Sequence, residues 1–587
     1  MKIVNKLRTI MKNNNIDHYI ITSNDPHQSE YVADYYKGRA YISGFTGSAG
    51  TLLVSSDKAK LWTDGRYFIQ AENELKGSGI ELMKIATAGY PTLEEYIKEN
   101  VKENETLGIC GNCYAASAYK KLLEIAEENN FKINLEHDLL NHVWNDRPEL
   151  PKEKIFLHNV MFSGESAREK ILRIRKRMSE LKADNFILSS LDDIAWTFNI
   201  RGNDVKFNPV ALAYALISQD AATLYIDKKK VTDEIIRNLN YEGVKIKNYD
   251  DIFEDVRNIK TSVFIDLLKT NAEIYNAISK EVKVIEGTNI TTELKAIKNY
   301  VELASLDNCQ VRDGVAMVRF IKWLKESVGK IEVTELSATE KLSNLRAEGI
   351  NAKGDSFGTI AGYKDHAAMM HYSANEESDY EIKEEGLFLV DSGGQYLDGT
   401  TDITRTFVMG DLTEEEKIDY TLVLKGHIDL SMAKFLKGTT GMHLDILARA
   451  ALWKHGIDYK CGTGHGVGFF LSVHEGPQGI RPSGNTVVLE PGMILTNEPG
   501  VYKEGKHGIR IENTLVVIKD EANEFGDFYS FKTISYCPID LGAVIKDMLT
   551  KDEINWLNNY HETVYIKLAP FLNDEEKAFL KEITREI

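Results

Sequence analysis

Acidic residues end several short apolar runs in the C-terminal half of this 587-residue chain. Leu387–Val390 runs directly into Asp391, and a second acid, Asp402, lies among the β-branched residues of 401–406. Two glycines separate these stretches, so the pattern predicts a strand, a turn and a second strand, which would bring the two carboxylates together. A carboxylate at the end of a buried strand is costly unless it meets a cation. On this stretch alone, an ordinary acid at a turn is the alternative.

Two more acids and one histidine extend the pattern toward the C-terminus. Ile494–Asn497 is interpreted as another strand, and it also ends at an acid, Glu498. Glu512 follows within the stretch 507–514, where the strand period of two places it on the same face as Arg510. His465 is enclosed by glycines, whose missing side chains allow a ligand or the backbone to come close to its ring.

Bound metal ions are the best explanation for this set of side chains. Four carboxylates packed together would repel one another strongly, and two divalent cations would neutralise their charge. Oxygen-rich ligation with one imidazole and no thiolate suits Mn²⁺, and less selectively Co²⁺ or Zn²⁺. Two ions roughly 3.5–4 Å apart can hold a bridging hydroxide and polarise a carbonyl group. A single carboxylate is better explained by a salt bridge, but the set as a whole predicts a dinuclear metal site.

The composition argues against several other classes of protein. Hydrophobic residues at 43% and charged residues at 27% are typical of a globular chain, and a net charge of −18 argues against nucleic-acid binding. The N-terminus lacks the apolar stretch of a signal peptide, and no apolar run reaches the length of a membrane span. The five cysteines are few and scattered, which indicates a reducing compartment, so a cytoplasmic protein is expected.

One pair of these cysteines has a spacing that occurs in functional sites. Cys110 and Cys113 are separated by two residues, as in a redox pair or in half of a zinc site. No second pair of this kind exists in the chain, so two ordinary thiols are the expectation.

The residues that precede the metal-site motifs alternate short strands with helices, which predicts α/β sheets. A glycine-rich turn at 42–50 leads into a strand pair, and the same order returns after Trp196. This weak internal repeat predicts two related α/β domains with Asn145–Pro151 as their linker. Neither half holds a catalytic set, and Arg201 and Asp204 are interpreted as surface charges.

A third domain is expected to begin near residue 299. Apolar residues recur at helical spacing from Leu303 to Leu324, although Gly314 argues against an unbroken helix. Capping boxes at 413–416 and 550–553 each predict the start of a further helix.

With these residues in view, the chain resembles aminopeptidase P (Xaa-Pro aminopeptidase), a pita-bread metallopeptidase, in its long three-domain form. The motifs that carry the resemblance span essentially the whole chain. They are HQSEY (27–31), SGFTGSAGT (43–51), WTDGRYF (62–68), WNDRPELP (144–151), LDDIAWTFNIRGNDV (191–205), DSGGQYLDGTTDITRT (391–406), GTGHGVG (462–468), VHEGP (473–477), NEPG (497–500), GIRIEN (508–513) and WLNNYH (556–561).

The resemblance implies the fold and the domain organisation. The fold class is α/β, with two related creatinase-like α/β domains at residues 1–153 and 154–298. A C-terminal α+β pita-bread catalytic domain follows at residues 299–587. The N-terminal domains would wall the cleft and supply a homodimer interface, as they do in the family.

Carried over residue by residue, the resemblance also implies the metal ligands. Asp391 would bind one ion, and His465 and Glu498 would bind the second. Asp402 and Glu512 would bridge both ions. The cofactor is then two divalent metal ions, with Mn²⁺ favoured over Zn²⁺ or Co²⁺.

Further roles follow from the same resemblance. Glu498 would handle the proton of the attacking water, and His371 and His474 would steady the peptide and the tetrahedral intermediate. Arg510 would orient the acidic ligands and contact the substrate region. For His474, a capped turn before Gly476 is the structural alternative.

The reaction implied is release of the N-terminal residue from a peptide with proline at position two, by attack of a metal-bridging hydroxide. The scissile bond is a tertiary amide without an N–H, so the site has to accept the proline ring instead. The nearest alternative is a prolidase, which cleaves only dipeptides that end in proline. A non-catalytic pita-bread module would have lost metal ligands, and none is missing here. A creatinase-type hydrolase shares the fold without requiring the ligand set.

The chain departs from the family pattern at one position. Cys461 stands where the three-domain members carry a further histidine that lines the substrate pocket. Hydrolysis is expected to survive because every metal ligand is present, whereas substrate affinity or preference beside the scissile bond is in doubt. His507 is a candidate replacement, although a histidine on a surface loop is the expectation.

Overall fold

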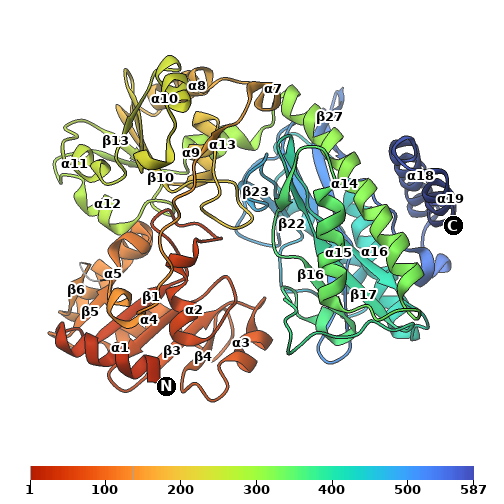
Figure 1. Cartoon of the computed structure of the whole chain (residues 1–587), viewed down its shortest axis with the longest axis horizontal. Helices are drawn as coiled ribbons and strands as arrows, with labels where there is room; N and C mark the ends of the chain where they lie inside the picture. The colour runs from red at the N-terminus through yellow and green to blue at the C-terminus, as the bar shows by residue number, and fades with distance from the viewer. Residues whose placement is uncertain (1, 136–137) are drawn as a thin grey trace. The chain divides into compact units, whose positions relative to one another are not determined.

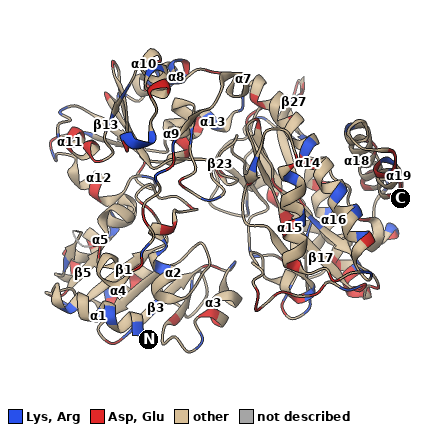
Figure 2. Cartoon of the chain, viewed as in Figure 1, with Lys and Arg blue, Asp and Glu red and all other residues tan. Residues whose placement is uncertain are grey.

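Figure 1 shows the computed structural model, which describes residues 2–135 and 138–587. The chain divides into two compact units. The first comprises Met1–Val160 with Glu165–Thr292, and the second comprises Met161–Gly164 with Glu293–Ile587. Acidic and basic residues are interspersed along the elements of both units, so no element carries the net charge alone (Figure 2). Within the described residues, no helix combines the length and the apolar character needed to cross a bilayer.

The first unit contains a six-stranded sheet in its N-terminal part. Its strands are joined in the order β4-β3-β2-β1-β5-β6, antiparallel at the β1–β2 and β2–β3 pairs and parallel at the others. The helix α1 (Lys2–Asn13) packs on this part through Val4, Leu7 and Met11, which lie three to four residues apart. The strands are β1 (His18–Thr22), β2 (Thr51–Ser55), β3 (Ala59–Thr63), β4 (Glu81–Lys84), β5 (Thr106–Ile109) and β6 (Lys132–Asn134).

A second six-stranded sheet in the same unit repeats this topology. Its order is β12-β11-β10-β8-β13-β14, again antiparallel at two adjacent pairs, β8–β10 and β10–β11, and parallel at the others. The internal repeat predicted from the sequence is therefore confirmed at the level of strand order and direction. The strands are β8 (Asn185–Leu188), β10 (Ala213–Ser218), β11 (Ala222–Ile226), β12 (Val244–Lys247), β13 (Val263–Ile265) and β14 (Val284–Glu286), with β7 (Phe156–Leu157) and β9 (Ile200–Arg201) paired separately.

Helices lie between the strands of both sheets, as expected for α/β domains. They are α2 (Gly38–Ser43), α3 (Phe68–Glu74), α4 (Leu93–Asn100), α5 (Ala116–Asn129), α6 (Leu140–Val143), α8 (Ala167–Glu180), α9 (Leu191–Phe198), α10 (Asp233–Tyr241), α11 (Asp251–Arg257) and α12 (Ala272–Ala277). Two more helices, α7 (Val160–Ser163) and α13 (Ile290–Ala296), lie where the chain passes between the units. The exact domain limits at 153/154 and 298/299 stay predictions.

The interpretation of Arg201 and Asp204 as surface charges is wrong, because both side chains are buried. The Arg201 guanidinium donates to the carbonyl oxygens of Ala195 and Ile200, each at 2.9 Å. Asp204 forms an ion pair with Lys230 and accepts a hydrogen bond from the backbone N–H of Leu212 at 2.7 Å. The sequence shows the two charged residues but does not show which groups they contact in the folded chain.

The second unit places long helices against several small sheets (Figure 1). Strands join in the orders β16-β17-β20, β15-β18-β19 and β21-β28-β27-β24, with the pairs β22-β23 and β25-β26. The capping boxes predicted at Thr413 and Thr550 are confirmed at the starts of α16 and α18. The helices are α14 (Tyr300–Ser327), α15 (Glu335–Ala347), α16 (Glu414–Ser431), α17 (Gly441–Trp453), α18 (Lys551–Leu568) and α19 (Asp574–Ile583).

The strands of this unit are short. They are β15 (Ala352–Asp355), β16 (Ile360–Tyr363), β17 (Leu387–Ser392), β18 (Gly394–Tyr396), β19 (Gly399–Thr400), β20 (Ile403–Val408), β21 (Lys434–Leu436), β22 (Gly464–Gly466), β23 (Glu475–Ile480), β24 (Ile494–Asn497), β25 (Gly500–Lys503), β26 (His507–Arg510), β27 (Asn513–Asn523) and β28 (Gly526–Thr533).

The helix α14 runs without a break through Gly314, contrary to the expectation from sequence. A side chain at position 314 would run into the carbonyl oxygen of Tyr536 and the side chain of Leu568. Glycine is therefore present because the backbone of another segment packs directly on the helix, and it does not mark a helix end.

Candidate metal centre

The first pair of acids is placed by two adjacent strands. β17 and β20 pair antiparallel with Asp391 opposite Thr404, and Asp402 lies immediately before β20. The predicted strand, turn and strand are confirmed, with the small hairpin β18–β19 inserted between them. Both carboxylates are buried and end up on the same part of the sheet.

The second pair of acids is placed by another strand pair. β24 and β27 run antiparallel with Asn497 opposite Asn513. Glu498 directly follows the first of these asparagines and Glu512 directly precedes the second. Two residues that are distant in sequence therefore leave adjacent strand ends together.

The predicted single strand through Arg510 and Glu512 is in fact interrupted. β26 ends at Arg510 and β27 begins at Asn513, so Glu512 lies between two strands. Its position is fixed by Thr404, whose carbonyl oxygen accepts from the Glu512 N–H at 3.1 Å. The Thr404 hydroxyl donates to the Glu512 carboxylate at 2.7 Å. These bonds join the two strand pairs at the site.

His465 completes the cluster from β22. Its backbone N–H donates to the hydroxyl of Thr496 in β24, at 3.1 Å. The ring Nδ1 donates to the carbonyl oxygen of Gly466 at 2.8 Å, which leaves Nε2 directed at the acids. Nε2 lies 3.4 Å from Asp402 Oδ2 and 3.6 Å from Glu498 Oε1.

Three of the five candidate ligands converge closely enough to share a metal ion. Atoms offered by Asp402, His465 and Glu512 all lie within 4.8 Å of one another. The Asp391 carboxylate accepts hydrogen bonds from Arg510 through one oxygen, at 2.7 Å to Nη2. Its other oxygen, Oδ1, is buried without a hydrogen-bond partner. A bound cation would supply the partner that this oxygen lacks.

The electrostatics of the cluster also require cations. Burial raises the pKa of Asp391 to about 6, against the Arg510 guanidinium and together with the charges of Asp402 and Glu498. Burial, followed by the charges of the other three carboxylates, raises the pKa of Glu512 well above its ordinary value. Without metal, the carboxyl groups of Asp391 and Glu512 therefore tend to keep their protons. Bound divalent ions would displace these protons.

His465 responds to the same field in the opposite sense. Burial by itself would lower the pKa of its imidazole, but the hydrogen bond to Asp402 and the charges of Glu498 and Asp402 raise it to about 9. The donor set is four carboxylates and one imidazole without a thiolate. These residues fit two divalent ions and favour hard or intermediate metals.

Comparison with known proteins identifies the family. Residues 4–134 and 146–302 each match the Creatinase/Prolidase N-terminal domain, residues 304–519 match Metallopeptidase family M24, and residues 527–587 match the C-terminal region of peptidase M24. Xaa-Pro aminopeptidase 1 of Dictyostelium discoideum is 39% identical, with 97% of this chain and 93% of that protein covered. The chain belongs to the aminopeptidase P family of M24 metallopeptidases. The resemblance read from the motifs is confirmed, as is the α/β class with creatinase-like N-terminal domains.

Solved structures place the aminopeptidase P fold on the whole chain. An X-prolyl aminopeptidase from Caenorhabditis elegans, described as a cytosolic enzyme with a di-nuclear active site, matches with a TM-score of 0.96 and 32% identity. That match covers 100% of this chain and 99% of the other. A Xaa-Pro dipeptidase from Bacillus anthracis matches at TM-score 0.52 and 24% identity over 64% of this chain, which indicates a shared fold alone.

The two histidines assigned to the substrate lie in different parts of this aminopeptidase P site. The ring of His474 is perpendicular to that of His465, with 4.3 Å between ring centroids. His371 follows Met370, whose carbonyl oxygen accepts from Arg510 Nη2 at 3.3 Å. The first histidine therefore adjoins a candidate ligand, and the second belongs to a segment that adjoins the Arg510–Asp391 pair. Their roles stay predictions.

The expectation of a surface-loop histidine at position 507 is wrong. His507 is buried in β26, and its Nε2 lies 2.7 Å from Asp419 Oδ2 of α16. Asp419 lies about ninety residues earlier in the chain, so the local sequence around His507 could not indicate this contact. Cys461 is half-buried, packs on the core of the catalytic unit, and its carbonyl oxygen accepts from Arg449 at 2.7 Å.

Arg405 and Tyr502 support the candidate ligands, and neither residue was predicted from the sequence. Arg405 is fully buried in β20 and Tyr502 accepts a hydrogen bond from Arg510 at 2.7 Å. The signal for Arg405 was present, because strand alternation places it on the face opposite Thr404 and Thr406, directed away from the site. A charged residue there has to find acceptors in the interior.

Proposed function

We propose that this protein is a metal-dependent aminopeptidase that releases the N-terminal residue from peptides with proline at position two. The observation that carries the proposal is the convergence of Asp402, His465 and Glu512 on one point, in a chain similar throughout to an X-prolyl aminopeptidase described as di-nuclear. The activity assigned to that relative is transferred to this chain on the strength of both.

We infer that two divalent ions, Mn²⁺ as first choice, are held by Asp391, Asp402, His465, Glu498 and Glu512. When bound, such ions lower the pKa of a coordinated water and polarise the scissile carbonyl. Arg510 keeps the carboxylate of Asp391 in one orientation by two hydrogen bonds, at 2.7 and 3.2 Å. The other Asp391 oxygen, which has no hydrogen-bond partner, would then be available to hold an ion.

Glu498 is the side chain best suited to move a proton. Its carboxylate is the most exposed of the four, with 21% of the side chain accessible, and Thr496 holds it by one hydrogen bond of 3.3 Å. A carboxylate with this freedom can accept the proton of the attacking water and deliver it to the leaving proline nitrogen. His474 and His371 would steady the substrate carbonyl and the tetrahedral intermediate.

The choice between an aminopeptidase and a prolidase depends on substrate length. The prolidase-type dipeptidase shares the fold over 64% of this chain, so the catalytic unit alone does not separate the two activities. The X-prolyl aminopeptidase matches over 100% of this chain and therefore also over the part that the dipeptidase match leaves uncovered. We therefore assign the longer Xaa-Pro peptides as substrates, and cleavage restricted to dipeptides would contradict this.

The test uses the full-length protein stripped of metal by a chelator and then reloaded with Mn²⁺. We expect hydrolysis of a Xaa-Pro-Xaa tripeptide to disappear on stripping and to return with Mn²⁺, with Zn²⁺ and Co²⁺ run in parallel. The matched peptide with alanine at position two serves as the specificity control. Equal cleavage of the two peptides would reject proline selectivity, and turnover without metal would reject the mechanism.

We further propose that the protein acts in the cytoplasm as a homodimer. The C. elegans relative is described as cytosolic, and the similarity to it extends over the whole chain. Sedimentation velocity of the purified protein tests the assembly, and a monomer at micromolar concentration would reject it. Fractionation of the source cells tests the location.

A further inference from the structure

One buried acid of the second unit lies outside the set of candidate metal ligands. Glu335 is the first residue of α15, and its side chain is fully buried. It is not needed as the cap of this helix, because the Thr334 hydroxyl already accepts from the Ser337 N–H at 3.2 Å. A buried carboxylate is costly unless hydrogen bonds or a cation satisfy it. The partners of Glu335 therefore show what this acid does.

Four groups of one segment, residues 363–380, donate hydrogen bonds to this carboxylate. Oε1 accepts from the Tyr363 N–H at 2.7 Å, and Oε2 accepts from the Tyr380 N–H at 3.1 Å. The Tyr372 hydroxyl donates to Oε2 at 2.9 Å. His366 Nδ1 lies 3.0 Å from both oxygens, and it must carry a proton because a carboxylate only accepts. The acid is thus satisfied from the start, the middle and the end of the segment.

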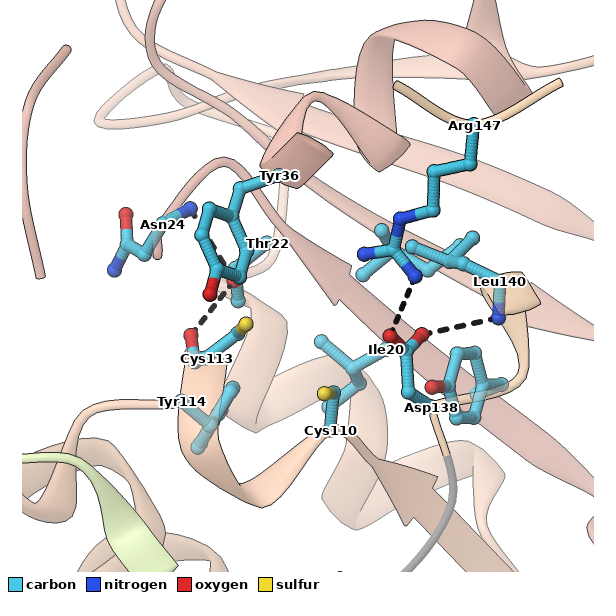
Figure 3. A pocket seen from close by; sticks show the side chains of 12 residues that line it. Ile20, Thr22, Asn24, Tyr36, Cys110, Cys113, Tyr114, Asp138, Leu140 and Arg147 are labelled. Carbon is cyan, nitrogen blue, oxygen red and sulfur yellow. Dashed lines mark hydrogen bonds and ion pairs between the residues drawn. The ribbon is translucent and has the colours of Figure 1, made fainter. Parts of the chain in front are cut away.

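This arrangement differs from that of an acid held by one cation and its own neighbours. In the first unit, Asp138 accepts from the Arg147 guanidinium at 2.6 Å and from the N–H of Leu140, two residues along the chain, at 3.1 Å (Figure 3). Such contacts fix only a short stretch of backbone. Glu335 is satisfied only while all parts of residues 363–380 are in place, so its charge selects one conformation of the whole segment.

Ring packing and a second acid strengthen the attachment of this segment to α15. The His366 ring stacks on that of Tyr380, with 3.6 Å between centroids, and lies 4.4 Å from that of Tyr372. Asp379 Oδ1 accepts from the Leu336 N–H, in the first turn of α15, at 3.0 Å. The segment is therefore docked on the helix N-terminus by several contacts, with the Glu335 carboxylate at their centre.

The middle of the segment is a tight turn that carries His371. The Tyr372 N–H donates to the Met369 carbonyl oxygen at 3.1 Å, which places Met370 and His371 at the two central positions of the turn. Because the Tyr372 hydroxyl donates to Glu335, the buried acid holds the residue that directly follows His371.

Strand β26 contacts the same segment from the candidate metal centre. Arg510 Nη2 donates to the Met370 carbonyl oxygen at 3.3 Å and to Asp391 Oδ2 at 2.7 Å. Gly508 packs so closely that a side chain there would run into the Ala367 carbonyl oxygen. The turn is thus attached to Glu335 through one residue and to the neighbour of a candidate metal ligand through another.

We propose that Glu335 is a positioning residue for the peptidase reaction, which fixes the 369–372 turn and with it the place of His371 beside the Arg510–Asp391 pair. The inference rests on the proposed function, in which His371 steadies the substrate carbonyl and the tetrahedral intermediate. Glu335 acts through the turn, because its side chain bonds to residues 363–380. A misplacement of about 1 Å at a reacting group can cost roughly 10²-fold in rate, so the conformation of the turn matters for turnover.

The kinetic test uses Glu335→Gln in the full-length, Mn²⁺-loaded protein. The amide keeps the size of the side chain, but its NH₂ group faces hydrogen-bond donors, so the turn loses support. We expect kcat for a Xaa-Pro-Xaa tripeptide to fall by about 10- to 100-fold, with Mn²⁺ content unchanged. Tyr372→Phe removes one hydroxyl, keeps the carboxylate and should lower kcat by a smaller factor. Glu376→Gln, exposed in the same segment, is the control and should keep the wild-type kcat.

A double-mutant cycle separates positioning from a general loss of stability. His371→Ala alone should lower kcat by about 10²-fold. Because Glu335 acts through His371, adding Glu335→Gln to that variant should change kcat by less than about twofold. An equal loss in both backgrounds would show a purely structural defect and overturns the proposal. Wild-type kcat in His371→Ala, or in both Glu335→Gln and Tyr372→Phe, also overturns it.

Hydrogen–deuterium exchange tests the turn without reference to turnover. We expect the backbone amides of residues 364–380 to exchange faster in Glu335→Gln than in the wild type, and those of β24 and β27 to be unchanged. Unchanged exchange in residues 364–380 overturns the proposal. A wild type that fails to cleave Xaa-Pro peptides rejects the proposed function, whereas an active wild type with unchanged exchange in the variant rejects this inference alone.

Discussion

Four carboxylates that repel one another occupy one buried cluster, and a single guanidinium, that of Arg510, contacts one of them. This arrangement is unfavourable in the absence of metal and favourable in its presence. Repulsion among the carboxylates destabilises the metal-free fold, and bound cations remove this repulsion. The stability of the catalytic unit therefore depends on its metal content.

The first prediction concerns Glu512→Gln, which replaces a buried carboxyl group with a raised pKa by a neutral amide of the same shape. The Thr404 hydroxyl can still donate to the amide oxygen. We expect the metal-free variant to unfold several degrees above metal-free wild type, since 1 kcal/mol shifts the melting temperature by roughly 2–4 °C in a domain of this size. The rise in melting temperature that Mn²⁺ gives to the wild type should be lost. Glu504→Gln, at an exposed turn, is the control and should change neither value.

The second prediction is that Glu498→Gln and Asp402→Asn each abolish activity while the fold is kept. Removal of a ligand and proton acceptor is expected to lower kcat by about 10³-fold or more. Peptide hydrolysis, circular dichroism and metal content are measured on the same samples. A variant that turns over at a near-normal rate would remove that residue from the site.

The third prediction addresses Cys461, a position at which the family resemblance leads us to expect a histidine. We expect Cys461→His to keep kcat and to lower KM for Xaa-Pro-Xaa peptides. Cys461→Ser is the size-matched control and should leave KM unchanged. A large fall in kcat for the histidine variant would show that the cysteine has a role of its own.

At the scale of whole elements, β20 links the candidate metal centre to helix α18, near the C-terminus. The buried guanidinium of Arg405 satisfies five oxygen acceptors outside its own neighbour Thr404, at 2.6–2.9 Å. One is the carbonyl oxygen of Glu512 and another is the hydroxyl of Tyr560 in α18. The segment that carries Glu512 is therefore stabilised through Arg405 by α18, which contributes no candidate ligand. The acceptors are Glu512, Asn513, Cys537, Pro538 and Tyr560.

The fourth prediction is that Gly314→Ala destabilises α14, although alanine is the better helix former by about 1 kcal/mol. The added methyl group would overlap the Tyr536 carbonyl, and overpacking of this kind typically costs about 1–3 kcal/mol. We expect the melting temperature to fall by a few degrees. Asn308→Ala, at an exposed position of the same helix, should be neutral or slightly stabilising. Equal effects in both variants would show that no close approach occurs.

The candidate ligands could be predicted from the sequence because they carry local signatures. Asp391 and Glu498 each follow a predicted strand, and glycines flank His465. The prediction that Arg201, Asp204 and His507 are exposed was wrong, because their burial depends on tertiary packing. The helix through Gly314 was misjudged for the same reason, since the packing of Tyr536 against it is a tertiary contact.

At the scale of the whole molecule, two buried neutral histidines make the protein sensitive to acid. His427 donates from Nδ1 to the Asn497 carbonyl and accepts at Nε2 from Asn513, each at 3.1 Å. Burial, and then the charge of Arg405, lower its pKa to about 3 and that of His561 to about 4. Protonation of either ring would place an unfavourable positive charge in the buried interior near Arg405.

The fifth prediction follows from the sign of these shifts. Both folded pKa values lie below the unfolded value of about 6.5, so the unfolded chain binds more protons and stability falls as pH drops from about 6.5 toward 3–4. At pH 5 each histidine should cost about 2 kcal/mol. The melting temperatures of wild type and His427→Gln are compared at pH 7 and pH 5, and the gap between them should narrow by several degrees. A constant gap would contradict the assignment.

The candidate ligands lie between the start of β17 and the start of β27, and Arg405 donates to Tyr560 in α18. During synthesis on a ribosome, the centre cannot assemble until almost the entire chain has been translated. A polypeptide released early would lack Glu512 or the helix that steadies it, and it would cut nothing. Premature termination therefore yields inert fragments and no unregulated protease.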